Sequence, residues 1–178
     1  TNTPYAPVRR ILRSLTGLNG SESDAEAWRK LEESVGRTLP GKVADVTPFL
    51  AWMLDVELPE EVGHRTTYLQ PPQLRAEAFR AIATLIEGRA RRAPLVIAFE
   101  DLHWADASSL ELIPLLFDLA ARAPVTILLL FRPRRDEPSW EVHETASRDY
   151  PHLYSHVPIS PLPVDDTRAL VAHLLAVD

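Results

Sequence analysis

Two adjacent carboxylates follow a short apolar run and are the first residues in this sequence to suggest chemistry. The five apolar residues 95–99 do not alternate with polar ones and are too few for a buried helix. They predict a strand covered on both faces, as in a parallel sheet. Glu100 and Asp101 come next, at the carboxyl end of that strand, where open α/β sheets bind their ligands. The alternative is that the two acids only cap the strand or begin a turn, where Asp is common.

The stretch LVIAFEDLHWADASSLELI, residues 95–113, resembles a known family. It looks like the Walker B strand and following helix of P-loop signal-transduction ATPases of the AAA/STAND kind, found in multidomain bacterial adenylate and guanylate cyclases and LuxR-type regulators. The resemblance is strong over residues 94–132. It implies that the intact protein binds ATP and Mg²⁺, that Glu100 holds the metal through water, and that Asp101 orients the attacking water.

A second apolar run, 124–131, predicts another buried strand, and it ends at Arg132. If the two strands are parallel neighbours, Arg132 lies beside Glu100 and Asp101. The resemblance places a phosphate-sensing residue at this strand end, which implies that Arg132 contacts the γ-phosphate. The alternative is a structural ion pair with the same two acids.

Residues 36–43, GRTLPGKV, have the G-x-x-x-x-G-K spacing of a phosphate-binding loop. Val43 follows the lysine where such loops carry a Mg²⁺-binding Ser or Thr, and Pro40 removes a backbone amide. The residues before position 36 are typical of a polar helix, whereas a phosphate-binding loop follows a buried strand. We therefore expect an interhelical turn here.

Composition describes an ordinary globular domain: 178 residues, 46% hydrophobic and 25% charged. A net charge of −6 disfavours direct nucleic-acid binding, and the chain has no cysteine for disulfides or thiolate zinc sites. It also lacks a signal peptide and any apolar run near 18 residues, so we expect a cytoplasmic protein without a membrane segment. The start at Thr1 on TNTPYAP resembles a family segment that follows the phosphate loop, which indicates a fragment lacking the Walker A part.

The expected fold class is α/β: an incomplete three-layer, P-loop-NTPase-like parallel sheet with a helical insertion in the N-terminal half. Strands are expected near 94–99, 124–131 and 153–159. Helices are expected over 7–16, 23–36, 45–55, 73–88 and 108–122, and a last helix is expected to be capped at Asp165 or Asp166. Residues 57–72 are expected to form a loop or a short lid-like connection, and residues 137–150 a loop with a weak helix. Pro114 predicts a bend or a late start in its helix, and Asp106 is expected to cap it rather than to act in catalysis. Residues 1–90 would form the helical segment and 91–178 the Walker B and sensor half.

The leading hypothesis is therefore an ATP-binding and ATP-hydrolysing switch domain of a multidomain signalling or regulatory protein. Asp101 and Arg132 are the candidate catalytic residues, Glu100, Asp101 and Arg132 would bind the nucleotide, and Glu100 would hold the metal. The expected partners are the other domains of the parent polypeptide and, through open sheet edges, a second copy. The rival hypothesis is a non-catalytic scaffold that supports protein interactions.

Overall fold

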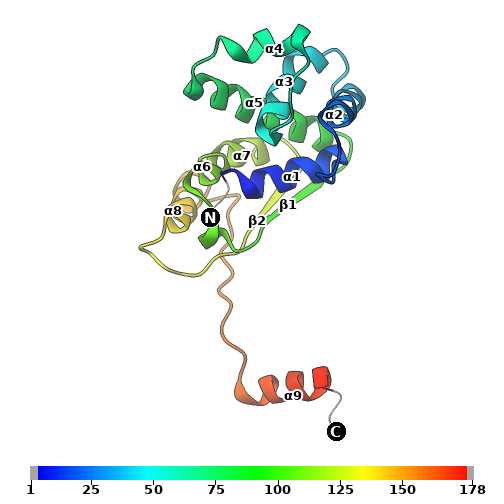
Figure 1. The fold of residues 1–178 in the computed structure, drawn as a ribbon. Helices are drawn as coiled ribbons and strands as arrows, with labels where there is room; N and C mark the ends of the chain where they lie inside the picture. Colours follow the sequence, from blue (N-terminus) through cyan, green and yellow to red (C-terminus); the bar gives the residue numbers. More distant parts are fainter. Residues whose placement is uncertain (1–3, 176–178) are drawn as a thin grey trace.

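The protein, seen here as a computed structural model that describes residues 4–175, combines many helices with one two-stranded parallel sheet (Figure 1). This is the expected α/β class, with more helix than sheet. In chain order the elements are α1 (Ala6–Thr16), α2 (Asp24–Thr38), α3 (Val43–Leu54), α4 (Glu60–Thr67), α5 (Pro71–Ala90), β1 (Leu95–Phe99), the 3₁₀ helix η1 (Leu102–Trp104), α6 (Ala107–Leu110), α7 (Ile113–Ala120), β2 (Val125–Leu129), α8 (Pro138–Asp149) and α9 (Val164–Leu175).

The first half of the chain is helical, as predicted. Gly17 ends α1 in a left-handed conformation (φ 76°), which glycine adopts without strain. Ser23 caps α2, because its hydroxyl accepts a hydrogen bond from the Glu26 amide. Helix α3 packs against both α2 and α5, and this explains why it carries more apolar residues than one helix face can hold.

One prediction for this half is wrong. The Pro-rich stretch 57–72 is not a loop throughout, because α4 occupies Glu60–Thr67 within it. Pro59 stands immediately before the first helical residue, and Glu60 and Glu61 lie in the first turn, where the helix dipole favours acidic side chains. A helix start is therefore compatible with the prolines around it.

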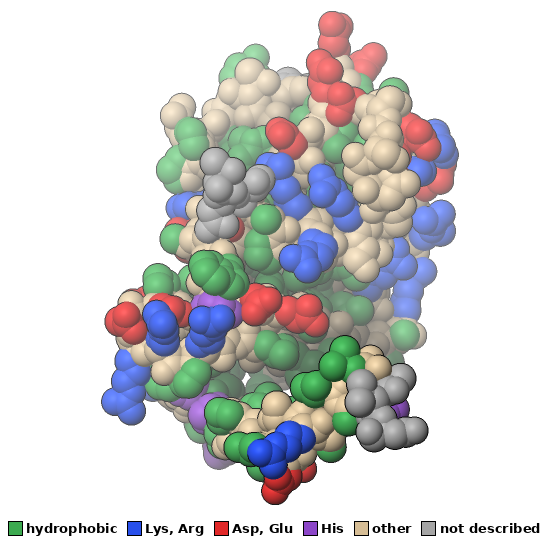
Figure 2. Space-filling model, turned by 60° about the horizontal axis from the view of Figure 1, so that its bottom comes forward, with side chains coloured by type: hydrophobic (Ala, Val, Ile, Leu, Met, Phe, Trp, Pro, Cys, Tyr) green, Lys and Arg blue, Asp and Glu red, His purple; other side chains and the backbone are tan. Residues whose placement is uncertain are grey.

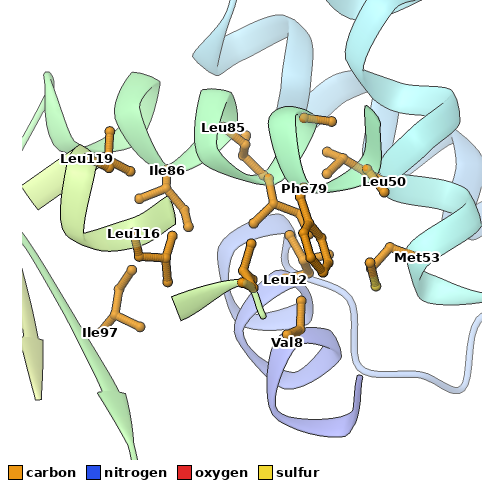
Figure 3. Packing of buried hydrophobic residues seen from close by; sticks show 14 of the residues in the cluster. Val8, Leu12, Leu50, Met53, Phe79, Leu85, Ile86, Ile97, Leu116 and Leu119 are labelled. Carbon is orange, nitrogen blue, oxygen red and sulfur yellow. The ribbon is translucent and has the colours of Figure 1, made fainter. Parts of the chain in front are cut away.

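A single hydrophobic core joins the helices to the sheet (Figure 3). It contains side chains from α1, α3, α5, β1 and α7, among them the labelled residues Val8, Leu12, Leu50, Met53, Phe79, Leu85, Ile86, Ile97, Leu116 and Leu119. Helix α5 spans the core, contacting α3 at one end and α7 at the other. The helical half and the sheet are therefore packed as one unit.

Strands β1 and β2 run parallel in the register Leu95↔Val125 to Phe99↔Leu129. Helix α7 packs against β2, and Ile97 and Phe99 are buried. The opposite face is open: Val96 is 62% exposed, and Leu128 and Leu130 are also exposed. The expectation that the first strand is covered on both faces is thus wrong for the described residues, and the three-layer arrangement is not formed among them.

The predicted third strand is also wrong. Residues 153–159 form no strand, and the sheet in the described part of the chain has two strands. The segment leads to α9, which stands apart from the rest of the molecule (Figure 1) and has no buried residue. Helix α9 begins at Val164, one residue before the predicted cap. Figure 2 shows hydrophobic side chains on the surface of this C-terminal segment, at the lower edge of the view.

The helix predicted over 108–122 is divided into α6 and α7. Pro114 lies in the first turn of α7, where its missing amide costs no hydrogen bond. Of the two alternatives predicted for Pro114, a bend or a late start, the late start is the one observed.

Candidate functional site

The ends of the two strands lie side by side, because pairing continues beyond the strands themselves. The Leu130 amide donates to the Phe99 carbonyl at 2.9 Å, and the Leu102 amide donates to the Leu130 carbonyl at 2.9 Å. Glu100 and Asp101 therefore leave β1 at the same edge of the sheet at which Arg132 follows β2. The structure brings these three predicted site residues to one edge.

The backbone at Asp101 turns sharply. Its φ of 51° is left-handed, a conformation that Asp tolerates better than most residues. The turn starts η1 and sends Leu102 into the core, while the Asp101 side chain remains 76% exposed. Glu100 is also exposed, and its carboxylate makes no hydrogen bond or ion pair with any described residue. Both carboxylates are thus accessible to a ligand.

Arg132 is exposed, and its guanidinium has no hydrogen bond or ion pair within residues 4–175. The structural ion pair with Glu100 or Asp101, left open by the sequence, is therefore not formed. The neighbouring Arg134 differs, since it lies 3.6 Å from Glu137. Arg132 thus provides an unpaired cation close to the strand ends.

Asp106 has the predicted capping role. Its Oδ1 accepts the Ser109 amide at 3.0 Å, and its Oδ2 accepts the Ser109 hydroxyl at 2.6 Å. Oδ2 also accepts the backbone amide of Tyr5 at 3.1 Å. Because Asp106 takes the capping position and Ala107 begins α6, the helix start expected near Ser108 is confirmed to within one residue.

An apolar groove of about 610 Å³ runs along the outer edge of β2, and no pattern in the sequence indicates it. Residues 125–131 form one wall, while α8 and the segment 153–159 form the other. Backbone groups alternate along a strand, and those of Leu130 face β1, so those of Ile127 and Leu129 face the groove. The groove therefore exposes the hydrogen-bonding edge of a strand between apolar walls.

Aromatic contacts hold the far wall of this groove. The hydroxyl of Tyr154 and Nδ1 of His143 share a hydrogen bond, and the rings of His143 and Trp140 lie 4.4 Å apart. Burial lowers the pKa of His143, and the nearby His156 lowers it further. The lowered pKa favours the uncharged form of His143, which suits its place in an apolar wall.

The spacing that resembles a phosphate loop occupies the α2–α3 connection, as expected. Gly36 and Thr38 are still helical, and the chain turns at Gly41 before α3 begins at Val43. A phosphate loop needs a run of free backbone amides following a strand, and half of this segment is helix. The predicted interhelical turn is confirmed.

Another feature that the sequence did not reveal is the burial of His103. Its side chain is only 6% exposed although it lies next to the exposed Trp104, and neither ring nitrogen has a hydrogen-bond partner. No periodic pattern covers the short η1, so the direction of this side chain could not be read from the sequence.

Within residues 4–175, no group of three or more His, Cys, Asp or Glu side chains is arranged so that it could hold a metal ion. A metal at the strand ends would therefore take few protein ligands, as is usual for Mg²⁺ bound with phosphates and water. None of the described helices is long and apolar enough to cross a membrane.

Comparison with known proteins gives one family and one relative. A family model described as "AAA ATPase domain" matches residues 1–130. The Rhizobium meliloti (strain 1021) protein called Uncharacterized protein R02095 is 36% identical over 63 residues, which are 35% of this chain and 6% of that protein. The match thus spans a small part of the relative's length. No solved structure matches the chain.

Proposed function

Because the chain belongs to the AAA ATPase domain family, we propose that it carries the Walker B and sensor elements of an ATP-hydrolysing switch in a multidomain signalling or transcription-regulatory protein. The observation that supports this most directly is the common edge at which Glu100, Asp101 and Arg132 lie. Two accessible carboxylates and an unpaired guanidinium at the carboxyl ends of parallel strands suit a charged, phosphate-bearing ligand.

Each of the three residues has a separate role in this proposal. Glu100 would hold Mg²⁺ through water, which suits an exposed carboxylate without a partner in the described residues. Asp101 accepts a hydrogen bond from the attacking water and so orients it, and Arg132 contacts the γ-phosphate. When bound, Mg²⁺ neutralises charge on the β- and γ-phosphates. The residues present fit Mg-ATP because the side chains of Glu100, Asp101 and Arg132 make no hydrogen bond with any other residue in 4–175.

A phosphate-binding loop must complete the site, and the α2–α3 connection does not provide it. We propose that polypeptide outside these 178 residues supplies the loop together with a strand that enters the groove beside β2. A strand in that groove can pair with the backbone groups of Ile127 and Leu129. If it runs parallel to β2, its end reaches the edge at which Asp101 and Arg132 lie.

The other domains of the parent polypeptide are the first partners, and the open edge of β2 also permits pairing with a second copy of this chain. A switch that uses ATP belongs in the cytoplasm, where its nucleotide is available.

A titration with labelled ATP tests the proposed function in the full-length protein. The variant is the double substitution Glu100→Gln and Asp101→Asn, which removes both charges while keeping similar shapes. We expect hydrolysis to fall by at least about a hundredfold, since catalysis would lose both the metal ligand and the water-orienting group. Arg132→Ala should reduce turnover as well. Arg134→Ala should not, because Arg134 pairs with Glu137 and has no role in the proposed site.

A matched control is the double substitution Glu32→Gln and Asp136→Asn, because both acids are exposed and neither has a partner in the described residues. It changes net charge equally and should leave ATP binding and hydrolysis unchanged. Equal hydrolysis by wild type and the Glu100/Asp101 variant would reject the enzymatic role. Absence of ATP binding by the wild-type protein would favour the scaffold hypothesis.

A further inference from the structure

His103 is a buried polar side chain that the fold does not satisfy. Its imidazole is 94% buried, and both Nδ1 and Nε2 lack a hydrogen-bond partner. Leaving a buried polar group unpaired costs about 1–3 kcal/mol, so such groups in native proteins usually have a reason to be kept. An apolar residue would fill the same space without this cost.

The Asp101 carboxylate lies within 4 Å of the imidazole. Nε2 of His103 lies 3.9 Å from Oδ1 of Asp101, which is too far for a hydrogen bond but within reach after a side-chain movement of about 1 Å. The Asp101 side chain is free to move because it is largely exposed. The His103 imidazole is not free to move, because it is buried and its ring centroid lies 5.2 Å from that of Trp104.

Backbone hydrogen bonds fix the main chain that carries Asp101 and His103. The amide of Leu102, between the two residues, donates to the carbonyl of Leu130 just after β2, and the amide of Trp104 donates to the Asp101 carbonyl at 2.8 Å. Asp101 itself has a left-handed backbone, and its carboxylate lies within 4 Å of the His103 ring. A fixed donor beside a mobile carboxylate is an arrangement that can select one rotamer of that carboxylate.

We propose that His103 is a positioning residue for Asp101: its imidazole donates Nε2–H to Oδ1 and so holds the carboxylate with Oδ2 facing the strand-end site. The proton stays on Nε2, and no covalent step is involved. This inference rests on the proposed function, in which Asp101 orients the attacking water. Misplacing such a group by about 1 Å can lower a rate by about a hundredfold.

Two substitutions at position 103 separate positioning from structural support in the full-length protein. His103→Leu removes the donor and the unpaired nitrogens, so we expect unfolding stability equal to or above that of wild type. We expect its kcat for ATP to fall about ten- to hundredfold while KM changes less than about twofold. His103→Gln keeps an N–H donor and should recover most of kcat. His152→Leu is the matched control, since His152 is exposed and has no partner in residues 4–175.

The outcomes distinguish this inference from the proposed function. If Asp101→Asn abolishes hydrolysis but His103→Leu retains the wild-type kcat, the positioning role is wrong and the proposed function stands. A readout without ATP tests the contact itself: ring ¹⁵N NMR spectra of the chain, compared between wild type and Asp101→Gly. We expect the Nε2–H tautomer in wild type and changed ring shifts in the variant. Identical spectra would overturn the inference even in a protein that does not hydrolyse ATP.

Discussion

The carboxylate of Asp106 accepts a hydrogen bond from the backbone amide of Tyr5, across 101 positions of the chain. The same carboxylate caps α6, and the ring of Tyr5 lies 6.1 Å from that of Phe79 and 6.4 Å from that of Trp52. One side chain thus joins the start of the helical half to the turn that follows the candidate site. In the sequence HWAD, residues 103–106, the last residue therefore has a structural role.

Replacing Asp106 with Ala should destabilise the protein. The substitution leaves the Tyr5 amide and the Ser109 donors without their acceptor, and the expected loss in unfolding free energy is about 1–3 kcal/mol. Urea denaturation measures it. Asp136→Ala, at an exposed position without a partner in the described residues, should change stability by less than about 0.5 kcal/mol. Equal losses for the two variants would contradict the bridging role.

The left-handed backbone at Asp101 predicts an order of stability for two substitutions. A Cβ in this conformation costs about 1–2 kcal/mol, while glycine costs about 0.5–1 kcal/mol through the freedom it gives the unfolded chain. Asp101→Gly should therefore be more stable than Asp101→Ala by about 0.5–1 kcal/mol. At Asp136, whose φ is not positive, the order should reverse, and thermal unfolding of the four variants tests this.

Glu22 predicts a loss of stability in acid. Its carboxylate accepts the amides of Asn19 and Gly20 and lies 3.0 Å from the Lys30 ammonium. The hydrogen bond from the Asn19 amide is the main cause that lowers the pKa of Glu22 to about 2. Because the folded pKa lies below the unfolded value of 4.5, this stabilisation is present above pH 4.5 and is lost as the pH falls towards 2.

The measurement is urea unfolding of wild type and Glu22→Gln between pH 2 and pH 6. We expect wild type to be the more stable above pH 4.5 and the difference to shrink as the pH is lowered. A difference that stays constant over this range would show that the charge on Glu22 does not contribute.

Two helical glycines predict opposite effects of alanine. Nothing lies within 4 Å of a Cβ built at Gly63, so Gly63→Ala should stabilise α4 by about 0.5–1 kcal/mol. A Cβ at Gly88 would lie 2.6 Å from Leu39 Cδ2 and 3.0 Å from Thr38 Cγ2, where α5 passes the end of α2. Overpacking there should exceed the helical gain and destabilise the protein by about 1 kcal/mol. Differential scanning calorimetry of both variants compares them directly, and a gain at Gly88 would show that α2 can move away.

Local patterns in the sequence predicted the elements whose stability is mostly local or depends on apolar periodicity. The runs 95–99 and 124–131 form a parallel pair, and Asp106 caps its helix. The prediction at 153–159 was wrong for a physical reason: a strand needs a neighbour to bond with, and among the described residues a groove separates this segment from β2. The sequence shows that residues 153–159 are apolar, but it does not show that no neighbouring strand pairs with them among the described residues.

The candidate site was predictable in part. Strand ends and a family resemblance pointed to Glu100, Asp101 and Arg132, and the structure places all three at one edge. The burial of His103 depends on how η1 turns against the rest of the fold, which no spacing in the sequence indicates. The open face of the sheet was likewise not foreseen, since Val96 and Leu128 look like core residues by type.

The unpaired edge of β2 has a consequence for solvent exchange. The amides of Thr126 and Leu128 face β1, whereas those of Ile127 and Leu129 face the groove, so deuterium should replace hydrogen at every second residue of one short strand much earlier than at its neighbours. Slow uptake at all four amides would reveal that another polypeptide segment already occupies that edge in solution.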